Sequence, residues 1–290
     1  MNEGASPRML RRRLRTELRN ARFKTGLTQE QVAKAMVWSL SKMIRIETAQ
    51  TGISVNDLKA LLSLYGITDK DRRAELVGLA QDARQAPWWR PYTEFAPPAL
   101  LQLIDYESAA SAVSQFETMF VPGILQIEEY ASAILEVFYD EKSSDERVAA
   151  LVDLRTKRRD LLTSKNAPKF SFVLDESVIH RLVGSPAIMN RQLRHLVDVT
   201  ELSNITIQLV PFTAGLHPGM QGPFEVVQFE DSPDESVVFV EERRGDFISD
   251  NPRETQGYLD NFERIAEKAL GPSDSVDLLR TVADHGLTSK

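Results

Sequence analysis

The sequence predicts an α+β protein overall, with an N-terminal all-α domain of five helices and a larger α+β domain whose one mixed or antiparallel sheet is covered by helices. Three observations predict this fold class. The chain has 290 residues, 42% of them apolar, which is room for one small and one larger core. Residues 8–83 show only helical spacing, whereas residues 99–290 mix helical and strand-like segments. We therefore assign domains to residues 1–85 and 99–290, joined by residues 86–98.

The first three helices are marked by their caps. The first spans residues 8–25 and ends at Gly26. Thr28 caps the second helix, and Gln31 three residues later completes a capping box. Ser39 caps the third. The side chains predicted to face the core from these helices recur at helical spacing: Leu10, Leu14, Leu18, Ala21, Val32, Ala33, Met36, Met43 and Ile46.

Two further helices complete the N-terminal domain. Ser54 caps the fourth, with Asp57 three residues on, and Asp69 opens the fifth. Their predicted inward side chains are Leu58, Leu61, Leu62, Tyr65, Leu76, Leu79 and Ala83. Five helices within about 85 residues indicate a compact helical domain.

Residues 28–47 have the pattern of a DNA-reading helix-turn-helix, with two short helices joined by a tight corner at Val37 and Trp38. The second helix has a small, polar and cationic outer face, and arginine can make a bidentate contact to guanine. A plain solvated helix face is the alternative. We expect base-edge contacts from Leu40, Ser41 and Arg45 and phosphate contacts from Gln29 and Lys42. The full set of predicted DNA-binding residues is Gln29, Ser39, Leu40, Ser41, Lys42 and Arg45, with Arg11, Arg12 and Arg13 adding salt-dependent affinity.

Charge is distributed unevenly along the chain. Residues 1–50 contain 11 Lys or Arg against 4 Asp or Glu, net +7, which leaves net −14 for residues 51–290. This asymmetry indicates that nucleic acid meets the N-terminal part and is repelled by the rest.

Composition excludes several classes of site. The chain has no cysteine, which excludes disulfides, thiolate zinc sites and thiol catalysis. The four histidines lie far apart in sequence, so we expect no metal and no cofactor. The arginine-rich start lacks the apolar core of a secretory signal, and no apolar run approaches the roughly 18 residues of a membrane helix. We therefore expect a cytoplasmic protein that associates with the nucleoid when it binds DNA.

Residues 10–66 resemble the XRE family, the phage-repressor-like helix-turn-helix regulators, through the stretches GLTQEQVAKAM, WSLSKMIRIE and LKALLSLYG. In that family an arginine late in the first helix pairs with a glutamate that ends the recognition helix. Arg22 and Glu47 match these positions, so the resemblance implies a structural ion pair. The family usually has glycine where Val37 stands, so this corner either stays right-handed or carries backbone strain.

The segment of residues 86–98, APWWRPYTEFAPP, is rich in proline and aromatic residues. We expect its rings to pack between the domains, although Trp88 and Trp89 could instead stack on bases. Helices are predicted over 99–113, 126–138, 144–164, 186–200, 252–270 and 273–284, and strands over 169–174, 206–210, 224–229, 237–241 and 245–248, with 114–121 ambiguous. The helix over 144–164 carries Arg155, Lys157, Arg158 and Arg159 on a face predicted to be mostly exposed.

The larger domain also resembles a known one, through FETMFVPGILQIEEYASAIL and NITIQLVPFTAGLHPGMQGPFEVVQF. These stretches are similar to the C-terminal domain shared by a large group of actinobacterial XRE regulators, sometimes described as antitoxin-like. In that group the regulator gene commonly lies beside one for a small protein. The resemblance therefore implies a small protein partner encoded by an adjacent gene.

Two places in the larger domain are candidates for further sites. Asp175, Glu176 and His180 could be proposed as an acid and base, but no nucleophile motif or phosphate loop accompanies them. The loop of residues 214–223, AGLHPGMQGP, could form a ligand or partner surface through His217, Gly219 and Gly222. A tight connection between two strands is the alternative for this loop.

Together these patterns predict a sequence-specific DNA-binding transcriptional regulator, not an enzyme. We expect a homodimer on a pseudo-palindromic operator, with the C-terminal domain mediating dimerisation and a partner or effector response. One alternative is an antitoxin-like protein that sequesters a small partner and autoregulates its own operon. Another is a small-molecule-responsive regulator.

Overall fold

The computed structural model describes residues 7–48, 51–138, 145–230, 236–241 and 246–285. Contacts between Cα atoms divide the chain into two compact units, Met1–Arg90 and Pro91–Lys290. The division falls inside the segment of residues 86–98. From that segment Tyr92 is buried, and its hydroxyl donates to Asp153 at 2.5 Å within the second unit.

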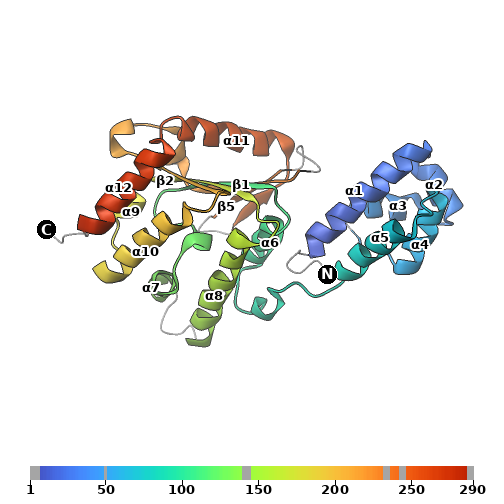
Figure 1. Ribbon diagram of the computed structural model, residues 1–290, viewed down its shortest axis with the longest axis horizontal. Helices are drawn as coiled ribbons and strands as arrows, with labels where there is room; N and C mark the ends of the chain where they lie inside the picture. Colours follow the sequence, from blue (N-terminus) through green and yellow to red (C-terminus); the bar gives the residue numbers. More distant parts are fainter. Residues whose placement is uncertain (1–6, 49–50, 139–144, 231–235, 242–245, 286–290) are drawn as a thin grey trace. The chain divides into compact units, whose positions relative to one another are not determined.

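The first unit is entirely helical (Figure 1). Its core is one apolar cluster to which all five helices contribute, including Leu14, Val32, Met43, Leu58 and Leu76. The core side chains predicted at helical spacing lie in this cluster or pack against it. The five helices are α1 (Pro7–Thr25), α2 (Gln29–Ala35), α3 (Leu40–Glu47), α4 (Val55–Leu64) and α5 (Lys70–Asp82).

Side-chain caps fix where these short helices begin. Thr28 Oγ1 accepts from the Gln31 N–H at 3.2 Å, and Gln31 Oε1 accepts from the Thr28 N–H at 2.9 Å, which closes a capping box on α2. Ser39 caps α3 and Ser54 caps α4 in the same way. Local sequence therefore sets the register of the helices before any packing occurs.

The corner between α2 and α3 carries strain at Val37. Its φ is +55°, and among the described residues it is the one non-glycine with positive φ. The side chain is 93% exposed, so no packing compensates for the unfavourable backbone. Of the two conformations the sequence left open, the structure has the strained one.

Val37→Gly is therefore expected to leave the stability of the first unit unchanged or to raise it by about 1 kcal/mol. A left-handed conformation costs an L-residue roughly 1–2 kcal/mol, and the greater chain entropy of glycine offsets part of the gain. Urea unfolding of the full chain measures the effect. Ala35→Gly is the matched control, because it places glycine in right-handed backbone and is expected to destabilise. A clear loss of stability in Val37→Gly contradicts the conclusion that the backbone at Val37 is strained by a positive φ.

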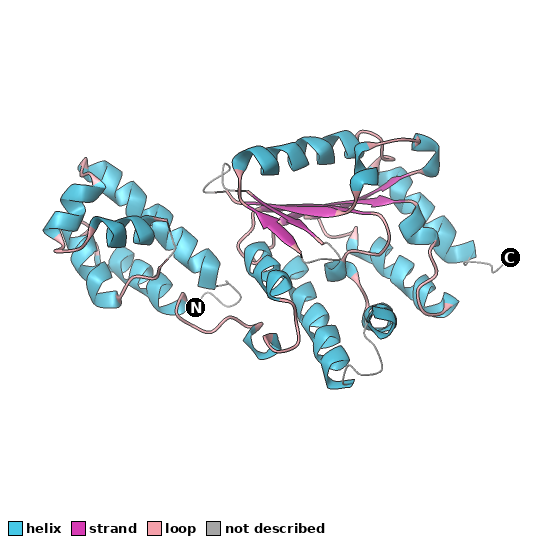
Figure 2. Cartoon of the chain, turned by 180° about the vertical axis from the view of Figure 1, so that it is seen from behind, coloured by secondary structure: helices cyan, strands magenta, loops and turns pink. Residues whose placement is uncertain are grey.

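The second unit is a six-stranded mixed sheet with helices on both faces (Figures 1 and 2). The strands are β1 (Ala112–Glu117), β2 (Lys169–Asp175), β3 (Ile205–Val210), β4 (Phe224–Gln228), β5 (Val237–Val240) and β6 (Phe247–Ser249). The helices are α6 (Pro98–Glu107), α7 (Glu128–Phe138), α8 (Asp145–Arg158), α9 (Ser177–His180), α10 (Pro186–Val199), α11 (Pro252–Ala266) and α12 (Pro272–His285).

The sheet has the order β3-β2-β1-β4-β5-β6. β1, β2 and β3 run parallel, and β4, β5 and β6 continue the sheet antiparallel. On one face Phe170, Phe172 and Leu174 pack with α7, α10 and α12, and on the other Phe116 and Val173 pack with α11. The predicted fold class is confirmed, and the sheet is of the mixed kind.

Two predicted elements of this unit were wrong. The helix expected over 99–113 ends at Glu107, and β1 begins at Ala112, because Ser111 already pairs with Gln228 and Lys169 at the start of the sheet. The helix expected over 144–164 ends at Arg158 and continues as a 3₁₀ turn over Arg159–Thr163. Arg158 itself is buried, contrary to the predicted exposed face, because carboxylates from α6 and β4 surround it.

Candidate nucleic-acid interface

Helix α3 divides its side chains between core and solvent. Met43 and Ile46 are buried in the core of the first unit. Ser39 Oγ accepts from the Lys42 N–H at 3.2 Å and fixes the helix start. The residues that face outward lie at spacings of one and four, which is one stripe of a helix: Leu40, Ser41, Ile44 and Arg45.

Lys42 is engaged within the protein. Its Nζ lies 3.0 Å from Asp57 Oδ2 of α4 and 4.2 Å from the centroid of the Trp38 ring. The Asp57 carboxylate neutralises the ammonium charge, and the Trp38 ring covers one side of the ammonium group. Arg45 is exposed, and its side chain has no hydrogen-bond or ion-pair partner among the described residues. Arg45 is therefore the cation of this helix that is free to meet a base edge.

A buried ion pair locks α3 to α1. Arg22 Nε donates to Glu47 Oε1 at 2.7 Å, and its second nitrogen donates to Oε2 at 3.1 Å. Arg22 also donates to the Leu27 carbonyl at 2.8 Å, and Gln29 Nε2 donates to Glu47 Oε2 at 2.7 Å. The hydrogen bond with Glu47 raises the pKa of Arg22. The predicted phosphate ligand Gln29 is thus also part of the network that holds the motif.

A hollow of about 620 Å³ opens beside this pair. It lies between the end of α1, the start of α2 and the end of α3. Arg19 and Phe23 line it, with the guanidinium 5.5 Å from the centroid of the ring. An exposed cation next to the start of α2 suits a phosphate of a nucleic-acid backbone.

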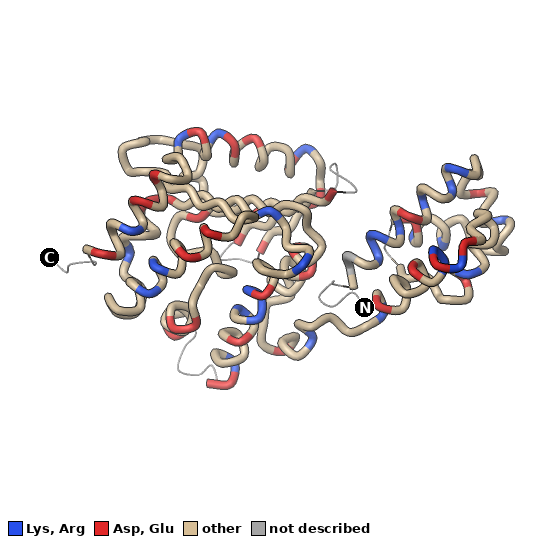
Figure 3. Tube along the Cα trace, in the orientation of Figure 1, with Lys and Arg blue, Asp and Glu red and all other residues tan. Residues whose placement is uncertain are grey.

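The three arginines of α1 that are predicted to add affinity for DNA are in different environments. Figure 3 shows basic residues spread along this helix. Arg11 Nε donates to the Pro7 carbonyl at 3.1 Å, and Arg13 pairs with Glu75 of α5 at 2.9 Å. Arg12 is half-buried. Of the three, Arg13 is the most exposed, and its pairing with Glu75 reduces the charge that it can offer to DNA.

The second unit buries a group of carboxyl groups around one cation. Arg158 donates to both oxygens of Glu107, at 2.7 and 2.6 Å, and lies 3.6 Å from Glu225 Oε2. Gln115, which faces Glu225 across the β1–β4 pair, donates to Glu117 at 2.9 Å. Gln115 Oε1 and Glu225 Oε1 are buried without a hydrogen-bond donor among the described residues. Burial raises the pKa of Glu225, so we expect this carboxyl to retain a proton that supplies one missing donor.

The pH dependence of stability follows from Glu117 at the edge of this group. Its pKa is raised to about 8, chiefly by burial; the hydrogen bond from Gln115 opposes this rise, and the nearby Glu241 carboxylate adds to it. A raised pKa means that the folded state binds the proton more tightly than the unfolded state. Its contribution to stability is complete below the ordinary glutamate range and is lost as pH rises through about 8.

Glu117→Gln is therefore expected to flatten the decline in unfolding free energy between about pH 5 and pH 8.5 by about 2 kcal/mol. The full pKa shift of Glu117 corresponds to a larger free energy, and partial access of solvent to the side chain reduces that free energy. Urea unfolding at several pH values measures the slope. Glu129→Gln, on the exposed part of α7, is the control that leaves the slope unchanged. Identical slopes for wild type and Glu117→Gln contradict the prediction.

The loop of residues 214–223 packs tightly onto the sheet. His217 is buried, with Nε2 3.7 Å from Asp175 Oδ2 and its ring edge-on to Phe116. A Cβ atom at Gly219 would lie 2.3 Å from Phe116, and Gly222 has a φ of +130°. Both glycines are therefore required by the fold. A substitution at Gly219 would therefore disturb the packing against Phe116, and its effect would report on folding and not on the binding of a partner.

Asp175, Glu176 and His180 hold the chain at the ends of β2 and β3. Asp175 accepts from the Ser177 N–H at 2.9 Å, and Glu176 accepts from the Phe212 N–H at 2.7 Å. His180 lies 3.3 Å from Glu176 and stacks on Phe212. Each side chain has a structural partner, which suits a capping role.

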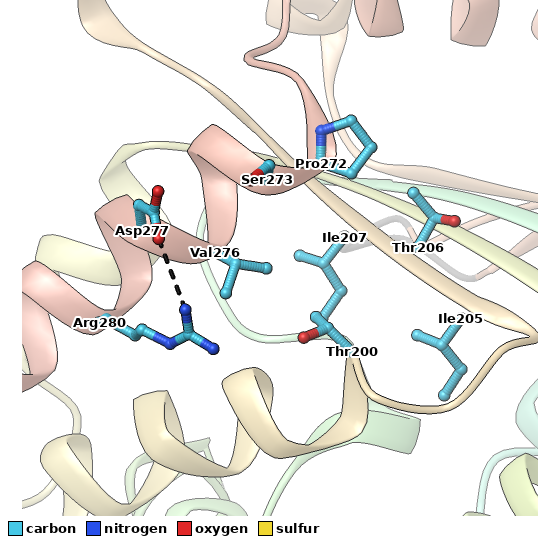
Figure 4. Close-up of a pocket in the computed structure, with 9 residues that line it drawn as sticks. All are labelled: Thr200, Ile205, Thr206, Ile207, Pro272, Ser273, Val276, Asp277 and Arg280. Atoms are coloured by element: carbon cyan, nitrogen blue, oxygen red, sulfur yellow. Dashed lines mark ion pairs between the residues drawn. The ribbon is translucent and has the colours of Figure 1, made fainter.

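A smaller cavity of about 320 Å³ lies between the end of α10, β3 and the start of α12 (Figure 4). Ile205 and Ile207 form one side, and Thr206 and Ser273 bring hydroxyl groups. Asp277 and Arg280 pair at 3.5 Å at its rim. The predicted loop residues do not line it. Its volume is near the lower end of ligand sites, which run from about 300 to 1,000 Å³.

Within the described ranges, no three His, Cys, Asp or Glu side chains are grouped so that they could hold a metal ion. No helix in those ranges is long and apolar enough to cross a membrane.

Sequence reasoning missed two features of these sites. The predicted set of DNA-binding residues does not include Ile44, yet Ile44 shares the outward stripe with Leu40 at a spacing of four, which the helical period could have indicated. Glu107 and Glu225 were not connected to Arg158, because they lie 51 and 67 residues away. Only the folded sheet brings these three side chains together.

Family comparisons agree with this division of the chain. Residues 13–76 match the family described as Helix-turn-helix domain, and residues 100–281 match the Domain of unknown function (DUF5753). No curated protein and no solved structure matches the chain. The second match spans well over half of the 290 residues. The chain therefore belongs to the DUF5753 family and carries, ahead of that domain, the helix-turn-helix of a DNA-binding regulator.

Proposed function

We propose that this protein is a sequence-specific transcriptional regulator that acts by binding and not by catalysis. The observation that carries the proposal is the outward stripe of α3, which presents Ser41 and Arg45 to solvent from a helix fixed by the Arg22–Glu47 pair. A rigid helix with an uncommitted arginine is what direct readout of a major groove requires. Mapping of the genomic sites bound by the full chain tests this, and the absence of any enriched sequence contradicts it.

Arg45→Ala is expected to cost about 1–3 kcal/mol of binding free energy on the selected operator and much less on random DNA. The loss is specific because the guanidinium contacts a base edge. Lys42→Ala is the matched control on the same helix. Asp57 already neutralises Lys42, so we expect a smaller loss that is equal on both DNAs. Fluorescence anisotropy at two salt concentrations measures both variants. Equal losses on operator and random DNA for Arg45→Ala exclude it as a reader.

The proposal includes a homodimer on a pseudo-palindromic operator. Two copies of α3 in successive major grooves require half-sites about 34 Å apart. Sedimentation of the chain with and without operator DNA tests this. A single half-site bound by a monomer contradicts it.

A second candidate function is the binding of a small partner protein. Exposed apolar side chains gather in the segments that follow β1, β2 and β3, where the parallel strands end: Met119, Leu182, Phe212, Leu216 and Met220. This surface favours the antitoxin-like alternative, in which the partner is sequestered. Co-expression with the adjacent reading frame tests it, and a stoichiometric complex that dissociates in Leu216→Asp but not in Val137→Asp supports it.

The small-molecule alternative is favoured by the cavity beside α12. Its hydroxyl groups and the Asp277–Arg280 pair could orient a small polar effector. A ligand that raises the melting temperature of wild type but not of Val276→Trp supports this role.

A further inference from the structure

The outward stripe of α3 contains two exposed apolar side chains that the fold does not use. Leu40 is 44% exposed and Ile44 is 39% exposed, and neither belongs to the core of the first unit. They lie four residues apart, so they stack along one line of the helix. Ser41 and Arg45 form a parallel line beside them. The stripe is therefore half apolar and half polar.

Single apolar residues are commonly exposed to solvent. Leu40 and Ile44 differ because both lie on the face of α3 that is expected to meet DNA. The inward face is filled by Met43 and Ile46, and the cation on the flank, Lys42, is held by Asp57. On α3, what remains for contact with DNA is two branched aliphatic groups, one hydroxyl and one guanidinium.

Base edges in the major groove offer one apolar group, the C5 methyl of thymine. Guanine offers two acceptors that suit arginine. An aliphatic side chain gains nothing from polar edges and loses hydration beside them, so its favourable neighbour is that methyl.

We propose that Leu40 and Ile44 read thymine methyl groups, so that the operator half-site carries thymines next to the base pair that Arg45 contacts. This inference rests on the proposed function and specifies the class of sequence that the site recognises. The rise from Leu40 to Ile44 is about 6 Å along the helix, which corresponds to roughly two base-pair steps. The two thymine positions are therefore expected one or two base pairs apart.

The test uses the full chain and begins with selection of bound sequences from a random pool. Each thymine of the selected half-site is then replaced by deoxyuridine, which removes only the methyl group. We expect one or two replacements to weaken binding of wild type by about fourfold each, the value of one buried methyl. Ile44→Ala or Leu40→Ala is expected to abolish the difference between thymine and uracil at one position each.

Ser41→Ala is the matched control on the neighbouring line, and it is expected to retain the full response to uracil. Thermal melting of each variant checks folding, which exposed side chains are not expected to change. Uracil replacement that leaves wild-type affinity unchanged, or that acts equally on wild type and Ile44→Ala, overturns the inference while the proposed function stands. Failure of wild type to select any sequence overturns the proposed function itself.

Discussion

Replacement of Arg158 with methionine is expected to destabilise the second unit by about 3–5 kcal/mol. The guanidinium makes two short hydrogen bonds to Glu107 and lies beside Glu225, and all three side chains are buried. Without it, the Glu107 carboxylate must either stay charged in a low-dielectric interior or take up a proton. Both outcomes cost free energy that the folded state alone bears.

Urea unfolding followed by hydrogen exchange of peptides from β1 and β4 measures this loss and locates it. Lys157→Met, one residue earlier in α8, is the matched control. Lys157 pairs with Asp153 and donates to the Tyr92 hydroxyl at 2.7 Å. Because both side chains of the ion pair are about half exposed, replacement of Lys157 is expected to change stability far less than replacement of Arg158. If Arg158→Met keeps wild-type stability, the predicted loss is wrong. The carboxyl groups are then neutral without the cation. Glu107→Gln in the same background then has no effect.

Replacement of Arg22 with methionine is expected to destabilise the first unit by a similar amount, about 3–5 kcal/mol. Glu47 is buried and accepts hydrogen bonds from Arg22 and Gln29. In the variant, Gln29 is the one side-chain donor to Glu47 that remains among the described residues. Because Glu47 ends α3, the recognition helix loses its attachment to α1. Binding to operator and to random DNA is therefore expected to fall together.

The control for this variant is Arg13→Met, which removes an exposed pair with Glu75 from the same helix. It is expected to have little effect on unfolding. Hydrogen exchange of peptides from α1 and α3 separates loss of folding from loss of a DNA contact. Normal protection in Arg22→Met together with lost DNA binding assigns Arg22 to the interface and contradicts a structural role.

Local signals in the sequence predicted the first unit well. Thr28, Ser39 and Ser54 act within three residues of the groups that they cap, so no distant contact was needed to place α2, α3 and α4. The strained corner could be located from the resemblance, because a glycine is usual where Val37 stands. Its positive φ could not be inferred from the residues alone, since a β-branched side chain argues against it.

The second unit was harder because its central features depend on distant partners. β1 has the sequence AVSQFE, and both of its faces are covered, so no alternation of apolar and polar residues marks it as a strand. Gln115 and Glu117 look like surface residues, yet they belong to the group around Arg158. A buried polar group is invisible to periodicity, because the residues that satisfy it lie on other elements.

The place of β1 in the sheet also has a consequence for the order of folding. β1 pairs with β2 more than 50 residues later and with β4 more than 100 residues later, and Ser111 bonds Gln228 across 117 residues. In the first unit the most widely separated helices that pack together, α1 and α5, are joined across 62 residues by the Arg13–Glu75 pair, about half the separation of Ser111 and Gln228. Since closing long loops slows folding, the DNA-binding unit is expected to fold on the ribosome well before the sheet is complete. In that interval β1 has no partner on its β4 side, which makes the nascent second unit the part of the chain most dependent on protection from aggregation.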